Sequence, residues 1–429
     1  MRRTVVFKHG FLLAGLLALG SQLVGVGQEP AGRGGAAGGR GGGAGQAAAP
    51  DLKWIEDLQW NKVDDQRLDW INVGAWEPRG DGVQPVRVPK DWRGQFPAAT
   101  ARRALAAAGV AVRFRTDSKR IVVRATLIDT PDVTANNPPL EWERARPPYF
   151  DLYLDGKFVQ SIAGAIRPDR QDVVILNEPD MPAKESEVTL LFPFYYRNAE
   201  IIMNAIGVTK TAKLTRAGAD QRPRVLFHGD SITHGHGVFR PRETYVWRSC
   251  EIAGCVPLNL GFGGSAWTDN IVAQYIASRN DWDTLVLMLG TNSFGGADSS
   301  GKPETAAQYG EKYDAFLSTI RQKAPNKPIL VVTPILSGGD VAPRRPRKNR
   351  NGEIQQDYRN AIARVVRQRQ AKDKNLALLD GLQLVNDPLY LLPTDVLHPN
   401  VAGELRIADG VAASLKPMLT KKGSVNSSR

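Results

Sequence analysis

A regular alternation of apolar strands and helices in the C-terminal half of the chain constrains its fold more than any other feature. The strand-like runs are Arg224–Gly229, Val256–Leu260, Thr284–Leu289, Pro328–Ile335 and Leu376–Asp380. The helical stretches that follow them are Glu243–Ala253, Thr268–Ser278, Glu304–Lys323, Glu353–Ala371 and Val401–Leu415. Strands that alternate with helices form a parallel sheet covered on both faces. We therefore predict an α/β domain over 223–420, with a three-layer, flavodoxin-like parallel sheet.

The preceding stretch, 51–212, has a different rhythm. Its short runs are rich in Val, Ile, Phe and Tyr and are bounded by Gly, Pro, Asp and Asn, as strands are. The clearest runs are Val110–Phe114, Arg120–Ile128, Tyr149–Leu154, Phe158–Ala163, Asp172–Leu176 and Glu187–Phe192. One helical piece, Ala98–Ala108, interrupts them. This pattern predicts an all-β domain, a sandwich or jelly roll, in front of the α/β domain.

The first residues have the pattern of an export signal. Arg2, Arg3 and Lys8 precede the apolar run Phe11–Val26, which is shorter than the about 20 residues that span a membrane. We predict a cleaved signal peptide over 1–28, and hence a secreted or periplasmic protein without a stable membrane anchor. An uncleaved anchor is the alternative.

Two further segments have compositions that cannot bury a core. Residues 29–50 are almost wholly Gly, Ala, Gln, Pro and Arg, which predicts a flexible linker. Residues 421–429 are equally poor in apolar side chains, and we predict a disordered tail.

Composition narrows the functional classes. Hydrophobic residues make up 42% of the chain and charged residues 23%, as in ordinary globular proteins. The net charge of +12 is accompanied by no nucleic-acid-binding module, so we predict no nucleic-acid partner. The two cysteines, Cys250 and Cys255, exclude a cysteine-ligated zinc module. In an exported chain they either form a disulfide or lie buried as two thiols.

A serine, a histidine and an aspartate stand where the sheet would present them to a ligand, which binds beyond the C-terminal ends of parallel strands. Ser231 follows the first strand, and Asp395 and His398 lie just before the last helix. A serine hydroxyl needs a base to act as a nucleophile. The spacing predicts Ser231 as nucleophile, His398 as base and Asp395 as the acid that orients the base.

Two other segments suit the stabilisation of an oxyanion. The glycine-rich stretch Asn259–Ser265 follows the second strand, and Asn292 follows the third. Glycines let backbone N–H groups approach a ligand, and an Asn amide can donate to a developing charge. His228, His234 and His236 flank Ser231 and could suggest a metal. We predict that they do not act as the base and that the protein uses no metal or cofactor.

In this order, the segments resemble those of the SGNH, or GDSL-like, hydrolase superfamily of esterases and acylhydrolases. The resemblance covers about 223–420. It implies that Ser231 is the nucleophile and also donates to the oxyanion through its backbone N–H. It further implies Gly264 and Asn292 as oxyanion donors, and Asp395 with His398 as the acid and base.

The front half resembles the β-sandwich that precedes one SGNH subgroup and carries a Gly-x-Asp-Leu-Tyr signature. The matching stretches are Val112–Ser118 and Phe150–Tyr153, with Tyr149 at the position of the signature glycine. A second departure is Ser293 after Asn292, where many members have Asp. Asn292 itself is present, so the implied oxyanion role stands.

These observations together predict an exported serine esterase that hydrolyses O-acyl esters through an acyl-enzyme on Ser231. The resemblance and export imply O-acetyl esters of a carbohydrate. Acyl transfer, or hydrolysis of a lipid or aryl ester, is the first alternative, and a non-catalytic carbohydrate-binding surface protein is the second. The basic run Arg344–Arg350 follows the fourth strand, and is either a solvated loop or a rim that attracts an anionic substrate.

Overall fold

The computed structural model describes residues 52–129, 147–180, 182–194, 199–341 and 346–420. The predicted signal peptide, linker and tail, 1–28, 29–50 and 421–429, lie outside these residues and stay predictions. Among the described helices, none is long and apolar enough to cross a membrane.

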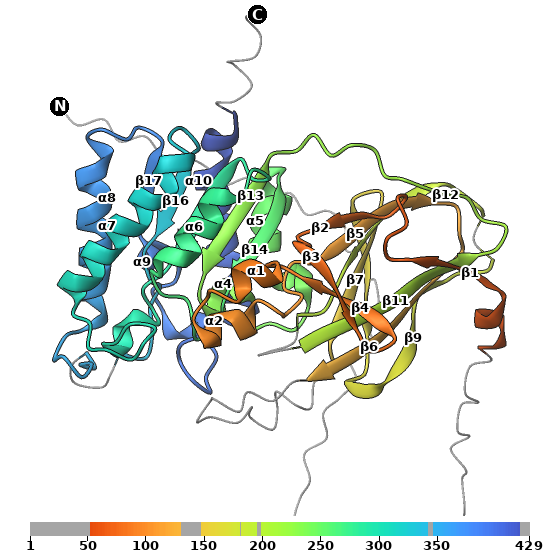
Figure 1. Ribbon diagram of the computed structural model, residues 1–429, viewed down its shortest axis with the longest axis horizontal. Helices are drawn as coiled ribbons and strands as arrows, with labels where there is room; N and C mark the ends of the chain where they lie inside the picture. Colours follow the sequence, from red (N-terminus) through yellow and green to blue (C-terminus); the bar gives the residue numbers. More distant parts are fainter. Residues whose placement is uncertain (1–51, 130–146, 181, 195–198, 342–345, 421–429) are drawn as a thin grey trace, which may run out of the picture. The chain divides into compact units, whose positions relative to one another are not determined.

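Two antiparallel sheets make up the first half of the described chain (Figure 1). One contains β1 (Leu58–Lys62), β3 (Ala75–Arg79), β4 (Gly82–Val86), β6 (Arg120–Asp129), β9 (Arg167–Asn177) and β11 (Ala199–Thr209). The other contains β2 (Asp69–Ile71), β5 (Ala111–Thr116), β7 (Tyr149–Leu154), β8 (Lys157–Ala163), β10 (Ser186–Leu191) and β12 (Leu214–Thr215). Buried side chains of both sheets, such as Phe114, Ile121 and Phe150, share one core. The predicted β-sandwich is confirmed; its jelly-roll form stays a prediction.

Several strands of this sandwich have no counterpart among the predicted runs. Strands β3 and β4 contain Pro78 and Pro85, and proline usually argues against a strand because it cannot donate to the ladder. Both prolines are tolerated because β3 is an edge strand and β4 pairs with β11 through a single pair of residues. The predicted helix over 98–108 is shorter, since α2 ends at Arg103.

Two short helices, α1 (Lys90–Arg93) and α2 (Ala98–Arg103), follow β4. Pro89 and Pro97 stand immediately before them, where the fixed φ of proline suits the start of a helix. Phe96, which lies between these helices, packs against Phe262 of the second half, with ring centroids 6.3 Å apart.

The second half contains a five-stranded parallel sheet in the order β14-β13-β15-β16-β17. Its strands are β13 (Arg224–Gly229), β14 (Val256–Gly261), β15 (Thr284–Met288), β16 (Ile329–Val332) and β17 (Leu376–Leu379). The helices are α4 (Ser231–His234), α5 (Tyr245–Ala253), α6 (Asn270–Ser278), α7 (Ala306–Lys323), α8 (Gln355–Gln370), α9 (Gly381–Leu384) and α10 (Val401–Thr420). This strand order is the flavodoxin-like one, so the predicted α/β fold is confirmed.

Helices cover both faces of this sheet (Figure 1). The apolar sides of α6, α7 and α8 pack on one face, and those of α5 and α10 pack on the other. Short 3₁₀ turns also occur, at Lys53–Asp57, Pro241–Glu243, Ser293–Gly295 and Pro388–Tyr390. Cys250 at the end of α5 and Cys255 before β14 form a disulfide, which decides between the two states that the sequence left open.

The two halves share part of their packing. Ile71, Val88 and Phe96 of the first half belong to the same buried cluster as Leu258 and Phe262 of the second. Their separation into folding domains over 51–212 and 223–420 stays a prediction.

Candidate active site

Ser231 lies on the turn between β13 and α4. The carboxylate of Asp230 accepts a hydrogen bond from the backbone N–H of Ile232 at 3.0 Å and so caps the helix. Gly229 ends the strand, and a Cβ there would lie 2.6 Å from the carbonyl oxygen of Met288. Glycine is therefore required for this turn, which places Ser231 at the C-terminal edge of the sheet.

The structure brings Ser231, His398 and Asp395 together. Oγ of Ser231 lies 2.8 Å from Nε2 of His398, and Nδ1 of His398 lies 2.7 Å from Oδ2 of Asp395. The other carboxylate oxygen of Asp395 accepts from the backbone N–H groups of Leu397 and His398 at 2.9 and 3.1 Å. These side chains thus have the relative positions of a nucleophile, a base and an orienting acid.

The charge on Asp395 fixes the tautomer of the histidine. Burial tends to raise the pKa of Asp395, but the hydrogen bonds from His398 outweigh it and keep that pKa below its usual value. An ionised carboxylate can only accept, so Nδ1 of His398 carries the hydrogen and donates it to Asp395. Nε2 then has a free lone pair with which to accept the proton of Ser231.

The three other histidines of this region are buried and make contacts of other kinds. Nδ1 of His228 bonds to the carbonyl oxygen of Leu260 at 2.9 Å, and burial lowers the pKa of His228 to about 4. Nδ1 of His234 accepts the backbone N–H of Gly263 at 3.2 Å. The ring of His236 stacks on that of His398, with centroids 3.5 Å apart. Burial lowers the pKa of His234 and His236 well below the usual value.

The loop after β14 carries the predicted oxyanion donor Gly264. Gly264 has a φ of +68°, a conformation that favours glycine over other residues. A Cβ on the neighbouring Gly263 would lie 3.6 Å from both Cα and Cβ of Ser231. The loop therefore passes directly against the nucleophile.

Asn292, the other predicted donor, is tied to the same loop. Its side-chain carbonyl oxygen accepts the backbone N–H of Ala266 at 3.0 Å. This contact commits the oxygen of the amide to the loop and leaves the NH₂ group to serve as a donor. The arrangement suits a group that stabilises charge developing on a carbonyl oxygen.

Side chains of the first half donate to the carbonyl groups of this loop and of the end of β14. Arg87 donates to the carbonyl oxygens of Asn259 and Gly261 at 3.1 and 2.9 Å, and Nε of Arg103 donates to Gly263 at 2.7 Å. The hydroxyl of Thr100 donates to Ser265 at 2.8 Å. We call these residues, Arg87, Thr100 and Arg103, the loop clamp. They hold this segment through its backbone carbonyl oxygens.

The loop clamp is the part of the site that sequence reasoning missed. Arg87 is fully buried, and its side-chain hydrogen bonds to described residues all go to backbone carbonyls, those of Ala106 and Arg103 among them. Burial lowers the pKa of Arg87 to about 9, as expected for a cation without a carboxylate partner. A single arginine between two valines, Val86 and Val88, gives no sequence signal for such a role.

Both halves of the chain match known family models. Residues 227–406 match the GDSL-like lipase/acylhydrolase family. Residues 58–214 match the GxDLY model, which describes the N-terminus of SGNH-hydrolase-type esterases.

The chain belongs to the SGNH, or GDSL-like, hydrolases. It is a carboxylic ester hydrolase by this membership. No curated protein matches its sequence at a significant level.

Solved structures similar to this SGNH hydrolase share its fold. A salicylyl-acyltransferase from a tetracycline biosynthetic pathway is 22% identical, with a TM-score of 0.70 over 87% of this chain and 99% of that one. A family two carbohydrate esterase from Clostridium thermocellum, in complex with cellohexaose, is 15% identical, with a TM-score of 0.55 over 82% and 99%. An acetyl xylan esterase from Butyrivibrio proteoclasticus is 13% identical, with a TM-score of 0.55 over 85% and 100%.

The signature residues of the SGNH sandwich contact the segment after the nucleophile. Oδ2 of Asp151 accepts the backbone N–H of Arg242 at 2.8 Å, and Oδ1 accepts the hydroxyl of Ser161 at 2.5 Å. The indole N–H of Trp247 donates to the hydroxyl of Tyr153 at 3.2 Å. The signature therefore joins β7 to the start of α5.

One group of side chains in the SGNH site has the composition of a metal site. The ligand atoms of His236, Asp395 and His398 lie within 4.8 Å of one another. However, both ring nitrogens of His398 are committed, one to Ser231 and one to Asp395. The geometry fits a catalytic triad better than a metal, and the absence of a metal requirement stays a prediction.

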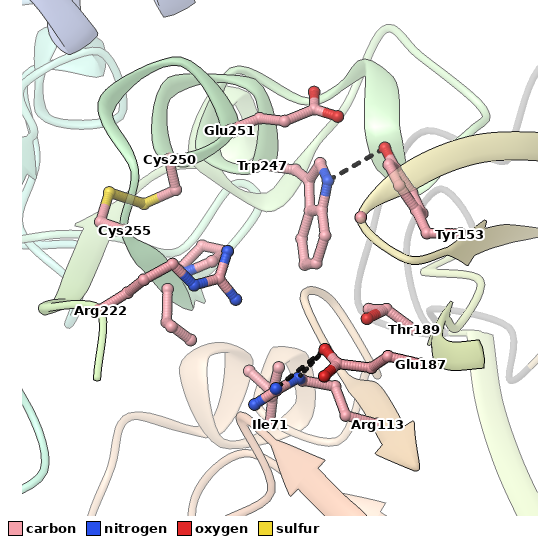
Figure 2. A pocket seen from close by; sticks show the side chains of 13 residues that line it. Ile71, Arg113, Tyr153, Glu187, Thr189, Arg222, Trp247, Cys250, Glu251 and Cys255 are labelled. Carbon is pink, nitrogen blue, oxygen red and sulfur yellow. Dashed lines mark hydrogen bonds and ion pairs between the residues drawn. A yellow bond between two sulfur atoms is a disulfide. The ribbon is translucent and has the colours of Figure 1, made fainter. Parts of the chain in front are cut away.

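Two cavities of the SGNH hydrolase differ in their relation to the triad. One, of about 700 Å³, is lined by Asn292 and Asp395. The other, of about 180 Å³, is lined by no predicted site residue, and Figure 2 shows it. Its charged groups are already paired, Arg113 with Glu187 at 2.9 Å and Arg222 with Asp220 at 2.6 Å. We therefore place the active site at the first cavity.

Proposed function

We propose that this SGNH hydrolase is an exported serine esterase, which cleaves O-acetyl esters of a carbohydrate through an acyl-enzyme on Ser231. The observation that carries the proposal is the pair of contacts from Ser231 to His398 and from His398 to Asp395, at 2.8 and 2.7 Å. They link a hydroxyl to a base whose second nitrogen is held by a carboxylate.

The reaction follows from these contacts. Oγ of Ser231 bonds to the ester carbonyl carbon while its proton passes to Nε2 of His398. The carbonyl oxygen becomes negative and accepts from Asn292 and from the backbone N–H groups of Ser231 and Gly264. When the tetrahedral intermediate collapses, the C–O bond breaks and the alcohol leaves with the proton from His398. Water repeats these steps to release the acid and restore Ser231.

The similar solved structures and the volume of the cavity support an acetyl ester of a carbohydrate as the substrate. Among the similar structures are an acetyl xylan esterase and a carbohydrate esterase in complex with cellohexaose. The cavity of about 700 Å³ beside the triad falls within the roughly 300–1,000 Å³ of small-molecule sites. It therefore accommodates an alcohol portion as large as a sugar.

The test is a series of p-nitrophenyl esters of increasing acyl length, followed by acetylated glycans, with Ser231→Ala as the control. We expect the acetyl ester to be hydrolysed fastest and acetate to be released from the glycans. A preference for long acyl chains would contradict the acetyl assignment. Glycan binding without turnover, unchanged in Ser231→Ala, would favour a non-catalytic binding protein instead.

Acyl transfer is the second candidate, because one similar structure is a salicylyl-acyltransferase. Transfer differs from hydrolysis only in that an alcohol, rather than water, attacks the acyl-enzyme. Turnover of p-nitrophenyl acetate with an added alcohol, followed by mass spectrometry, separates the two reactions. Acetate as the main product supports the esterase, and an acetylated alcohol in its place supports transfer.

Export is part of the proposal and has its own test. The basic and apolar residues before position 28 have the pattern of a signal peptide. N-terminal sequencing of the protein from the periplasm and the culture medium should find a chain that begins close to residue 29. A full-length chain in the cytoplasm would contradict export.

A further inference from the structure

The cavity beside the triad has a basic wall. It is formed by the loops that follow β15 and β16 and by the segment that precedes α10. Asn292 and Asp395, which belong to the catalytic centre, line this cavity. Arg347, Lys348 and Arg350 line it as well. The three cationic side chains therefore line the same cavity as two of the residues assigned to the catalytic centre.

The positive charge of this wall is not neutralised within the described residues. Arg347 and Lys348 are exposed, and no described carboxylate forms an ion pair with either. Nε of Arg350 donates to a neutral acceptor, the carbonyl oxygen of Gly296, at 2.9 Å. The single acidic residue of the lining is Asp395, and His398 and two backbone N–H groups already bind its carboxylate.

The loop that presents the cations is fixed at several points. The backbone N–H of Arg347 donates to Gly339 at 2.7 Å, and that of Asn349 donates to Glu353 at 2.8 Å. The side-chain NH₂ of Asn349 donates to the hydroxyl of Tyr358 at 3.1 Å. Because both ends of 347–349 are held, Arg347 and Lys348 keep their place at the cavity.

We propose that this basic wall binds a carboxylate on the alcohol portion of the ester, so that the substrate is an O-acetylated polysaccharide of uronic acids. A guanidinium group matches a carboxylate through two parallel hydrogen bonds, and the field of unpaired cations raises the local concentration of an anionic chain. The inference rests on the proposed esterase function. It specifies which carbohydrate that function serves.

The experiment compares the wild-type protein with the double variant Arg347→Gln/Lys348→Gln on acetylated polymers of equal acetyl content. The polymers are polygalacturonate, which bears carboxylates, dextran, which is neutral, and dextran sulfate. We expect the double variant to lose about tenfold in kcat/KM on acetylated polygalacturonate at low salt, mainly through KM. The loss should shrink in 0.5 M NaCl, an ionic strength of about 0.5 M, because salt screens exposed charges.

A matched control removes the same amount of charge elsewhere. Lys157→Gln/Lys323→Gln changes two exposed lysines that do not line the cavity and should leave all three polymers unaffected. Hydrolysis of p-nitrophenyl acetate, which lacks a carboxylate, should stay within about twofold of wild type in every variant. If p-nitrophenyl acetate is not hydrolysed at all, the esterase function itself fails.

The remaining outcomes test whether the basic wall binds a carboxylate, and they do not test the esterase function. An equal loss on polygalacturonate and dextran would overturn the proposal, because the wall would then act on any chain. The same is true of a loss confined to dextran sulfate, and of no loss on any polymer. A loss confined to polygalacturonate, with p-nitrophenyl acetate unchanged, supports it.

Discussion

The two halves of this hydrolase contribute to the active site in opposite ways. The α/β half supplies the groups assigned to the chemistry, Ser231, Asp395, His398, Gly264 and Asn292. The sandwich half supplies none of these, yet its loop clamp donates to the backbone carbonyls of Asn259, Gly261, Gly263 and Ser265. The sandwich half thus contacts the catalytic centre through backbone carbonyls rather than through a reacting side chain. It holds the loop on which the predicted oxyanion donor Gly264 stands.

The largest expected effect comes from the reacting residues of the α/β half. Ser231→Ala and His398→Ala should each lower kcat by several orders of magnitude, because only the oxyanion donors and substrate binding then remain. Circular dichroism should be unchanged, since Ser231 is small and lies on a turn. Retention of more than about a tenth of wild-type kcat in Ser231→Ala would contradict its assignment as nucleophile.

Asn292→Ala should have the next largest effect. The carbonyl oxygen becomes charged only as Ser231 attacks, so the amide of Asn292 acts mainly on the transition state. We expect a loss of about 3–4 kcal/mol in kcat with little change in KM. Rate and thermal stability should be measured on one preparation. A variant with a lower melting temperature but a normal rate per folded molecule would show that Asn292 is only structural.

Arg103→Met tests the loop clamp, and with it the contribution of the sandwich half. The loss of the donor to Gly263 should lower kcat about tenfold and leave KM nearly unchanged. A factor of about ten corresponds to the free energy of one hydrogen bond from a charged group. Arg103→Lys, which keeps a donor, should recover part of the rate.

Arg93→Met is the matched control for Arg103→Met. Arg93 lies on the neighbouring α1, where it pairs with Glu77 at 2.7 Å and donates to the carbonyl oxygen of Val88 at 2.9 Å. Among the described contacts, none joins it to the loop. This variant should lose stability but keep its kcat. If Arg103→Met and the wild-type protein had equal kcat values, the hydrogen bond from Arg103 to the loop would have no role in catalysis.

Asp151→Asn should change stability but not rate. Burial raises the pKa of Asp151 to about 6, well above the value of about 3.9 in an unfolded chain. Between these values the folded protein binds the extra proton, so the contribution of Asp151 to stability is full below about pH 4 and is lost as the pH rises through about 6. Urea unfolding should be measured from pH 4 to 7. The free energy of unfolding should fall less steeply with pH in Asp151→Asn than in the wild-type protein. A lower kcat at unchanged stability would instead give the signature carboxyl a catalytic role.

Metal removal should have no effect. Dialysis against EDTA should leave the rate unchanged, because His398 uses both nitrogens for Ser231 and Asp395. Recovery of a lost rate by an added divalent cation would instead assign His236, Asp395 and His398 to a metal.

The predictability of each part of the structure depends on whether its signal is local. The positions of Ser231, Asn292, Asp395 and His398 were predictable because each follows a strand or precedes a helix that hydrophobic periodicity locates. Their catalytic roles stay predictions. The loop clamp was not predictable, because its acceptors are backbone carbonyls, which every residue has. Strands β3 and β4 were missed because Pro78 and Pro85 oppose the strand pattern, and only pairing with a distant strand, β11, overrides it.

The wide separation of the triad along the chain sets an order of events during synthesis. Ser231 and His398 are 167 residues apart, and ribosomes add about 5–20 residues per second. The nucleophile thus leaves the ribosome roughly 8–33 s before its base. The clamp residues, Arg87, Thr100 and Arg103, are made earlier still. A nascent chain therefore contains the groups that hold the loop before it contains the loop, and it lacks a complete triad until His398 has been made.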